Sequence, residues 1–346
     1  MSSVGVVVPC YRYGHFLGEC VSSLLDDQPG ADVRVLVIDD ASPDGSAERA
    51  RDLARSDPRV EVRVHAENRG HIRTYNEGLL EWADTDYVTL VSADDLLTPG
   101  ALTRAVEFLD AHPSVGFVYG HPIHFDPASP LPPARTRVRG STVWPGHRWV
   151  AGRFRQAHNV ITTPEVVVRT SVQRRAGGYR EDLPHAGDLE LWMRLASHAD
   201  VGHLRGVDQA YYRVHGDNMS RTVFSAHLTD LVQRRDAFLA VLRSCDLPDP
   251  ESLHRTVRRR LAHEAVWRAS RAYDRRRTGT VPVAELLDFA RTTHPPITRS
   301  AVYTGFRMRR AVGPRIMPYL QPLIWTAVAS HARDRLWWAS WRRRGV

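Results

Sequence analysis

Short apolar runs alternate with helical patterns through the first hundred residues of this chain. The apolar runs are rich in β-branched residues, which is typical of buried strands, and the segments between them carry apolar residues at helical spacing. The predicted strands are Val4–Pro9, Val33–Ile38, Val60–His65 and a run that begins at Tyr87. The predicted helices are Phe16–Leu25, a segment that ends near Arg55, and Arg73–Ala83. This alternation predicts an α/β fold with a mostly parallel sheet covered by helices.

Polar residues follow three of these strands at the point where each strand ends. Pro9 leads into Cys10 and Tyr11, the second strand ends on Asp39-Asp40, and the run from Tyr87 stops on Asp94-Asp95. The carboxyl ends of parallel strands share one edge, where α/β proteins bind ligands. Adjacent carboxylates suit Mg²⁺ or Mn²⁺, and these ions suit the phosphates of a nucleotide. An isolated Asp pair is also typical of a helix cap, but the convergence of three strand ends favours a metal-nucleotide site.

The sequence lacks two common phosphate-binding motifs. It contains no GxGxxG after the first strand and no GxxxxGK[ST], which argues against dinucleotide oxidoreductases and P-loop enzymes. A divalent ion and arginines are then expected to hold the phosphates. Arg69 and Arg73 lie in a turn that leads to a helix, where arginine can bind phosphate with two parallel hydrogen bonds. The alternative for each is a solvated arginine on a helix face.

Composition indicates a globular chain and a reducing compartment. The 346 residues are 42% apolar, and the three cysteines show neither a paired framework nor metal-ligand spacing. The start lacks the basic and apolar regions of a signal peptide, and no apolar run reaches the length of a membrane span. We therefore expect a cytoplasmic protein. The pI near 9.8 suggests nucleic-acid binding, but no recognisable motif supports it, so no nucleic-acid partner is expected.

Positive charge is concentrated in the last third of the chain. All 47 basic residues are arginine, and residues 223–346 hold 23 of them against 10 acids, whereas residues 1–222 hold 24 against 29. Helices are predicted at Asp230–Arg243, Leu253–Arg276 and Leu323–Arg344. The last combines tryptophans with arginines, which is typical of a helix on anionic lipid and equally of a helix packed on the main domain or on a second subunit. Peripheral contact with the inner face of the cell membrane and a homodimer are therefore both retained.

Several motifs together resemble one known family. The stretches VVVPCYRYGHFLGECVSSLLDDQ, VLVIDDASPDGS, ENRGHIRTYNEGL and VSADDLLTPGAL resemble, in order and spacing, the nucleotide-binding half of family 2 inverting glycosyltransferases. Residues 159–196 resemble the acceptor-side segment of that family, and YRVHGDNMS resembles a segment that follows it. The resemblance implies a GT-A (Rossmann-like) fold. It divides the chain into a catalytic domain at 1–222, with a nucleotide-binding half at 1–100 and an acceptor half at 101–222, and an Arg-rich helical extension at 223–346.

The resemblance also implies roles for the residues at the strand ends. Pro9 and Tyr11 would border the nucleobase, Asp40 would hydrogen-bond the base, and Asp94 would lie near the ribose or the metal. The donor-binding set is thus Pro9, Tyr11, Asp40, Arg69, Arg73 and Asp94.

Asp95 is the implied metal ligand, to Mn²⁺ or Mg²⁺. Many family members carry a further Asp where this chain has Ser92, so the metal site can rest on Asp95 alone, with water and phosphate oxygens completing the shell. His215 is a candidate for a further metal ligand or for contact with the diphosphate. An ordinary packed or surface histidine is the alternative.

Asp188 is the candidate for the chemical step. It begins an apolar helical pattern in HAGDLELWMRLA, where a carboxylate is also typical of a helix start. By resemblance it is the general base that takes the proton of the acceptor, although the family usually has Glu where this chain has Gly187. His185 and Glu190 are the next candidates.

The segment Gly120–Arg153 is rich in Pro, Gly and Arg, which is typical of a functional loop. We expect a flexible acceptor loop in which Trp144, His147 and Trp149 stack on sugar, with ordinary loop anchors as the alternative. Trp192, on the helix of Asp188, is a further acceptor candidate.

These expectations combine into one function. The chain is predicted to move a sugar from a nucleotide diphosphate, expected to be UDP, to an unidentified hydroxyl by a metal-assisted single displacement, in bacterial glycan or glycoconjugate synthesis. One alternative is a nucleotide-sugar-binding protein without catalysis, suggested by Ser92 and Gly187. Another is a sugar nucleotidyltransferase, which would need a Gly-rich basic loop near the N-terminus that this sequence lacks.

Overall fold

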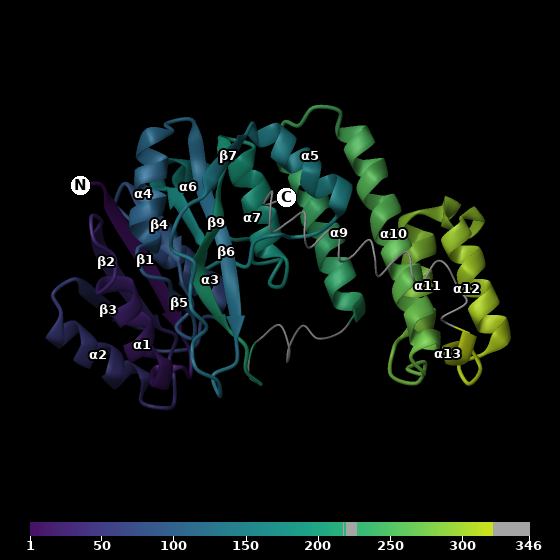
Figure 1. Ribbon diagram of the computed structural model, residues 1–346, viewed down its shortest axis with the longest axis horizontal. Helices are drawn as coiled ribbons and strands as arrows, with labels where there is room; N and C mark the ends of the chain where they lie inside the picture. Colours follow the sequence, from purple (N-terminus) through teal and green to yellow (C-terminus); the bar gives the residue numbers. More distant parts are fainter. Residues whose placement is uncertain (217, 219–226, 321–346) are drawn as a thin grey trace. The chain divides into compact units, whose positions relative to one another are not determined.

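The computed structural model describes residues 1–216, 218 and 227–320, which belong to two compact units (Figure 1). The first comprises Met1–Val150 and Asn159–Asn218, and the second comprises Ala151–His158 and residues 227–320. The helix predicted at Leu323–Arg344 lies outside the described residues. No described helix is both long enough and apolar enough to cross a membrane.

The first half of unit 1 follows the predicted alternation. Its strands are β1 (Ser3–Cys10), β2 (Asp32–Asp39), β3 (Val60–Val64) and β4 (Tyr87–Leu90), and its helices are α1 (Gly14–Leu25), α2 (Ser46–Ser56) and α3 (His71–Asn76), with a π-helix, η1 (Glu77–Trp82), directly after α3. β1 pairs in parallel with both β2 and β4, and β2 pairs in parallel with β3. The predicted strands and helices of this half are confirmed.

The second half of unit 1 extends the same sheet with mixed pairing. It contributes strands β5 (Leu96–Leu97), β6 (Val115–Phe125), β7 (Gly140–Trp144), β8 (Val166–Arg169) and β9 (Asp200–Arg213), and helices α4 (Ala101–Ala111), α6 (Thr170–Ala176) and α7 (Gly187–Ala196). Helix α5 (Gly146–Gln156) begins in unit 1, and its residues from Ala151 on belong to unit 2. The strand order is β3-β2-β1-β4-β8-β6-β9-β5, and β7 pairs with β9. β8 is antiparallel to both β4 and β6, so the sheet is parallel on its N-terminal side and mixed beyond it.

Burial of the central strands explains their all-apolar sequences. Val6, Val7 and Val8 of β1 are fully buried because helices cover both faces of the sheet (Figure 1). Each such side chain stabilises the fold by about 1.5–3 kcal/mol. Gly78 of η1 permits an especially close approach to β1, since a Cβ atom there would lie 2.3 Å from Val7 Cγ1. This contact packs the α3–η1 segment against β1, and the carboxyl end of β1 borders the candidate site.

The Gly120–Arg153 segment is not the long loop expected from its composition. β6 runs on to Phe125, and β7 and α5 occupy most of residues 140–156, so residues 126–139 and Pro145 are the part of this segment that lacks a regular element. Arg135 pairs with the buried carboxylate of Asp208 on β9 and anchors that stretch. Proline and glycine content alone did not reveal the long-range pairing of β7 with β9.

Two tryptophans expected at the acceptor are core residues. Trp149 is 1% exposed, and its indole N–H donates to Tyr119 Oη at 3.3 Å. Trp192 is 3% exposed and packs on Phe117. Neither ring presents a face to a sugar, so the expectation was wrong for both, because helix-face periodicity does not distinguish a core aromatic from a ligand-stacking one. Trp144 is partly exposed on β7, and His147 is exposed at the start of α5.

Unit 2 is helical. It contains α9 (His227–Ser244), α10 (Pro250–Asp274), α11 (Val283–Thr293), a 3-10 turn η2 (Pro295–Arg299), α12 (Ala301–Val312) and α13 (Met317–Leu320). The Asp249 side chain accepts from Ser252 N and Pro250 occupies the first turn, so the start of α10 is well specified. The helices predicted near Asp230–Arg243 and Leu253–Arg276 are confirmed.

Candidate active site

The carboxyl ends of β1, β2 and β4 bring the predicted acidic residues to one edge of the sheet. Asp40 N donates to Cys10 O at 2.9 Å on one side of β1, and Ala93 N donates to Pro9 O at 3.3 Å on the other. These bonds place Asp40 and the residue before Asp94 on either side of the end of β1. The convergence predicted from the strand ends is therefore present.

Asp40 organises the loop that follows β3. Its Oδ1 accepts from Arg69 N at 2.7 Å and its Oδ2 accepts from Gly70 N at 2.9 Å. His65 Nδ1 also contacts Oδ1, at 2.7 Å. Protein groups thus engage both oxygens of Asp40. By contrast, the buried Oδ1 of the neighbouring Asp39 has no hydrogen-bond partner in the described part of the chain.

Asp94 and Asp95 form the acidic centre of the site. Asp95 Oδ1 accepts from Arg213 N at 2.9 Å, and the Arg213 side chain donates from Nε to Asp94 O at 2.7 Å. His215 Nε2 lies 3.0 Å from Asp94 Oδ2. Arg213 and His215 follow from the end of β9, so that strand closes this side of the site. Within residues 1–216, 218 and 227–320, the second oxygen of each carboxylate receives no hydrogen bond.

The charge balance around Asp95 suits a cation. Both aspartates are nearly buried, at 5% and 3% exposed. Burial, and then the negative charge of Asp94, raises the pKa of Asp95 well above its ordinary value, and the N–H of Arg213 offsets only part of this rise. No described group of three or more His, Cys, Asp or Glu side chains could hold a metal. Two carboxylates are a donor set that Mg²⁺ and Mn²⁺ can use when water and phosphate complete the shell.

Asp188 is a partly buried carboxylate at the start of α7. Its Oδ1 accepts from Leu189 N at 2.7 Å, and its Oδ2 accepts from Asn159 Nδ2, also at 2.7 Å. Burial raises the pKa of Asp188 to about 6, although these bonds and the charge of His185 work in the opposite direction. A carboxylate that titrates near neutral pH is suited to proton transfer.

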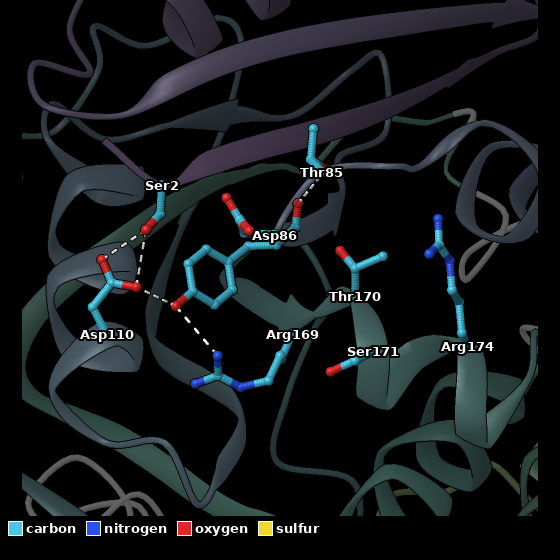
Figure 2. A pocket seen from close by; sticks show the side chains of 9 residues that line it. Ser2, Thr85, Asp86, Asp110, Arg169, Thr170, Ser171 and Arg174 are labelled. Carbon is cyan, nitrogen blue, oxygen red and sulfur yellow. Dashed lines mark hydrogen bonds between the residues drawn. The ribbon is translucent and has the colours of Figure 1, made fainter.

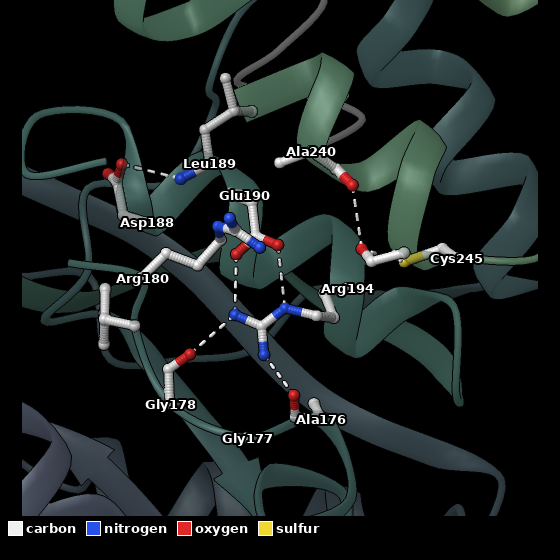
Figure 3. Close-up of polar contacts among 12 residues, drawn as sticks. Ala176, Gly177, Gly178, Arg180, Asp188, Leu189, Glu190, Arg194, Ala240 and Cys245 are labelled. Carbon is white, nitrogen blue, oxygen red and sulfur yellow. Dashed lines mark hydrogen bonds and ion pairs between the residues drawn. The ribbon is translucent and has the colours of Figure 1, made fainter. Parts of the chain in front are cut away.

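An ion pair fixes the helix that carries Asp188 (Figure 3). The guanidinium of Arg194 donates to both oxygens of Glu190 and to the carbonyl oxygens of Ala176 and Gly178. Glu190 is 0% exposed. Because both of its oxygens are committed to Arg194, Glu190 is a helix anchor and is poorly suited to act as a base.

Tyr75 links the donor-side acids to Asp188. It projects from α3, and burial raises its pKa above the ordinary value of a phenol, with the negative charges of Asp94, Asp95 and Asp188 adding to the rise. Because the charges of all three carboxylates act on the Tyr75 phenol, the three carboxylates lie in the same neighbourhood. The Tyr75 ring also meets the ring of Tyr179 edge-on at 5.4 Å.

The remaining donor candidates lie around this edge with other partners. Arg69 Nη1 donates to Glu77 Oε2 at 3.0 Å, and Arg73 pairs with Glu181 at 3.2 Å. Both arginine side chains are about half exposed, so their partners compete with water and can be exchanged for a phosphate. Tyr11 is 43% exposed just beyond β1.

Sequence reasoning did not single out four residues that the structure places here. Arg213, Asn159 and Glu165 lie inside stretches that carried the family resemblance, and Tyr75 lies on a predicted helix. Glu165 is 1% exposed and raises the pKa of Asp95 by its charge. The only local signal for Glu165 was its position directly before an apolar strand. Nothing in the neighbouring sequence indicated that Glu165 lies near Asp95.

A cavity of about 360 Å³ lies near the amino ends of β1 and β4 (Figure 2). Its acids already have partners, since Asp110 accepts from Ser2 Oγ at 2.9 Å and Asp86 accepts from Ser3 N at 2.8 Å. Ligands of α/β sheets bind at the carboxyl edge, which is the opposite one. The carboxyl edge near Asp94 and Asp95 therefore remains the candidate site.

The fold and this acidic edge define an α/β protein of the GT-A glycosyltransferase class. Residues 5–173 match the model of glycosyl transferase family 2, so this part of the chain is a family 2 glycosyltransferase region. The S. aureus protein TarS, residues 1–349, crystallised with UDP-GlcNAc, has a similar fold with a TM-score of 0.64 at 16% identity, covering 92% of this chain and 91% of TarS. The mannosyltransferase PcManGT from Pyrobaculum calidifontis, solved with GDP-Man and Mn²⁺, has a TM-score of 0.54 at 20% identity, covering 93% and 87%.

Sequence relatives match over shorter stretches. The uncharacterized glycosyltransferase EpsJ of Bacillus subtilis is 34% identical over 104 residues, which is 30% of this chain and 29% of EpsJ. The matched region spans between 13% and 29% of the length of this and two other curated relatives.

Proposed function

We propose that this chain transfers a sugar from a nucleotide diphosphate, with UDP as the expected nucleotide, to a hydroxyl group with inversion at the anomeric carbon. The observation that carries the proposal is Asp188, a partly buried carboxylate with a pKa of about 6 in the same neighbourhood as Asp94 and Asp95. A proton acceptor beside a cation-binding pair is what a single displacement from a sugar diphosphate requires.

The donor would lie along the ends of β1, β2 and β4. Pro9 and Tyr11 would border the base, and Asp40 would act through the Arg69–Gly70 loop that it holds. Arg69 and Arg73 would leave their glutamate partners to meet the diphosphate. In support, TarS and PcManGT, which have this fold, were solved with UDP-GlcNAc and GDP-Man.

Asp95 would hold a divalent metal, with Asp94 and His215 beside it. When bound, Mn²⁺ or Mg²⁺ offsets the negative charge of the leaving diphosphate. The residues fit such an ion because two nearly buried carboxylates each retain an oxygen without a described partner. Arg213 holds the pair in place from β9.

Asp188 would accept the proton of the acceptor hydroxyl as that oxygen attacks the anomeric carbon. One base is sufficient, because the new bond forms on the face opposite the departing diphosphate, and this geometry inverts the configuration. Trp144 and His147, partly exposed and exposed respectively, remain candidates for contact with the acceptor. The acceptor itself belongs to a glycan or glycoconjugate.

A thermal-shift screen of nucleotide sugars with and without Mn²⁺ tests the donor proposal. We expect one nucleotide sugar to raise the melting temperature more with the ion than without it. No shift with any nucleotide sugar would contradict the proposal. Metal-dependent hydrolysis of the identified donor then distinguishes an enzyme from the alternative suggested by Ser92 and Gly187, a binder without turnover. Formation of a nucleotide sugar from a nucleoside triphosphate would indicate the nucleotidyltransferase.

We further propose that unit 2 contacts anionic lipid at the inner face of the cell membrane. Residues 299–320 contain five arginines and no acid. Met308, Ile316 and Tyr319 are 46%, 56% and 73% exposed, next to the exposed Arg307, Arg310 and Arg315. Exposed apolar side chains among arginines are typical of interfacial segments. A homodimer through these helices is the competing outcome.

A further inference from the structure

Asn159 supplies the hydrogen bond to Asp188 that comes from outside the helix of Asp188. Asn159 Nδ2 donates to Asp188 Oδ2 at 2.7 Å, whereas the bond to the other oxygen comes from Leu189 N, the next residue along the chain. Asn159 Oδ1 accepts from Ile161 N at 3.2 Å, which fixes the orientation of the amide with its NH₂ group toward the carboxylate. The carboxylate is thus held from two sides, with one bond to each oxygen.

The segment that carries Asn159 is anchored independently of Asp188. The carboxylate of Glu165 accepts from Thr162 N at 2.6 Å, from Thr162 Oγ1 at 2.8 Å and from Thr163 N at 3.2 Å. Thr163 has a backbone φ of 127°, a value that residues other than glycine rarely adopt. Three bonds to one fully buried carboxylate hold this turn in a strained conformation, so Asn159 enters the site from a fixed support.

We propose that Asn159 is a positioning residue for the catalytic base, and that its amide holds the Asp188 carboxylate in the orientation needed to receive the acceptor proton. This inference rests on the proposed function. Asn159 touches neither the donor nor the acceptor and acts only through Asp188.

The other groups that face Asp188 cannot replace this bond. His185 lowers the pKa of Asp188 by its charge, and Tyr75 and Tyr179 interact with Asp188 electrostatically, since its charge raises the pKa of each phenol. Asn159 is the side chain that hydrogen-bonds the carboxylate in the described part of the chain. A donor to the charged form favours ionisation, so its loss should raise the pKa of Asp188.

The test compares Asn159→Ala and Asn159→Asp with the parent in the pH dependence of turnover. Asn159→Asp keeps the acceptor for Ile161 N and so preserves the turn, but it replaces the donor with a second carboxylate. We expect the acidic limb of kcat to move upward by about one pH unit for Asn159→Ala and further for Asn159→Asp, so that kcat at pH 6 falls about fivefold for Asn159→Ala and more for Asn159→Asp. An unmoved limb in both variants would overturn the inference.

Asn76→Ala is the matched control. Asn76 also clamps this neighbourhood, through bonds to Tyr179 N at 2.7 Å and Tyr179 O at 2.9 Å, but it has no bond to Asp188. The Asn76→Ala variant should have a lower melting temperature, but the acidic limb of its kcat–pH profile should not move. If Asn76→Ala moves the limb as much as Asn159→Ala, the effect of Asn159 is general loosening and the inference is wrong.

A double variant separates this inference from the proposed function. In an Asp188→Asn background, Asn159→Ala should lower turnover less than about twofold, because a residue that acts through Asp188 has nothing left to position. A further tenfold loss there would contradict the positioning role. If Asp188→Asn alone turns over at the parent rate, the assignment of the base fails, and the inference about Asn159 fails with it.

Discussion

Buried charge is arranged differently in the two units. At the active site of unit 1, acids outnumber their cationic partners, and burial raises the pKa of Asp95, Glu165 and Asp188. In unit 2, Glu264 on α10 accepts from Arg234 at 2.7 Å and from Arg268 at 2.6 Å. Burial alone would raise the pKa of Glu264, but attraction to these cations lowers it.

This difference separates a functional cluster from a structural one. The network of Glu264 stabilises its ionised members, so the charges contribute to holding α9 and α10 together. In the absence of a cation or a proton, the unmatched acids of unit 1 lower the stability of the fold. Such destabilising acids are typical of sites where a ligand supplies the missing positive charge. The comparison predicts opposite responses to substitution and to pH in the two units.

Asp188→Asn should produce the largest change. Asn keeps the size of the side chain but cannot accept the proton, so sugar transfer should fall by roughly 10²- to 10⁴-fold. Donor affinity should survive because the donor contacts lie on other elements. Turnover, donor affinity and melting temperature would be measured together. Transfer at the parent rate would move the base elsewhere, with His185 as the next candidate, since Glu190 is committed to Arg194.

Glu264→Gln should have the opposite effect: the rate of sugar transfer should stay at the parent value, and the protein should become less stable. It leaves Arg234, whose side chain is 6% exposed, without its closest carboxylate. We expect a loss of about 3 kcal/mol in the free energy of unfolding, at the low end for a buried ion pair because water reaches part of the network. Chemical denaturation provides the measurement. Glu251→Gln, in an exposed pair with Arg255, is the control and should change stability little. Equal effects of the two would show that the network is not structural.

The pH dependence of stability should differ in sign between the two acids. The folded pKa of Asp188, about 6, is above its unfolded value of 3.8, so its ionisation costs stability at neutral pH, on the order of 2–3 kcal/mol. This cost begins to decline as pH falls below 6 and is gone below the unfolded value of 3.8. Activity should fall over the same range. For Glu264 the folded pKa is lowered, so its stabilising contribution is present above the unfolded value of 4.5 and is lost as pH falls through the lower folded value. Melting curves of the parent, Asp188→Asn and Glu264→Gln across pH 3–8 check both signs. A parent and Asp188→Asn that respond identically between pH 7 and pH 5 would refute the assignment to Asp188.

Asp95→Ala tests the cation side of the comparison. Loss of the charged ligand should weaken Mn²⁺-dependent UDP binding by about 10- to 100-fold while the fold remains intact. Removal of an unmatched buried acid should also leave the melting temperature equal or higher in the absence of metal. Calorimetric titration of UDP with and without Mn²⁺ gives the answer. Unchanged affinity would remove Asp95 as a ligand.

The smallest effect is expected at the exposed basic surface of unit 2. Arg307→Glu combined with Arg310→Glu should reduce cosedimentation with anionic vesicles roughly tenfold or more at low salt, since each arginine near such a surface contributes about 1 kcal/mol. The same charge change on α2, Arg49→Glu with Arg51→Glu, is the control and should have less effect. If the parent never cosediments, the membrane proposal is wrong and dimerisation would be tested by light scattering. Deletion of Leu323–Val346 would show whether the residues beyond the described part contribute.

Local sequence patterns are sufficient to predict part of this site. Val4–Pro9, Val33–Ile38 and the run from Tyr87 are strands because their β-branched residues suit burial on both faces, and the acids directly after them necessarily lie at the strand ends. Because helices connect these strands in parallel, the carboxyl ends of the strands lie at one edge of the sheet. Asp39, Asp40, Asp94 and Asp95 could therefore be located without knowledge of any long-range contact.

The sequence by itself determined the alternation of the first hundred residues, the acids at the strand ends and the position of Asp188 at a helix start, because each of these depends on neighbours within a few residues. Only the tertiary structure decided that His215 contacts Asp94, that Asn159 bonds Asp188 and that Trp149 and Trp192 are core residues. These facts follow from the insertion of β8 between β4 and β6 and from the pairing of β9 with β6, which join segments far apart in the chain. Periodicity reports which face of an element is apolar, but it carries no information about which distant element covers that face.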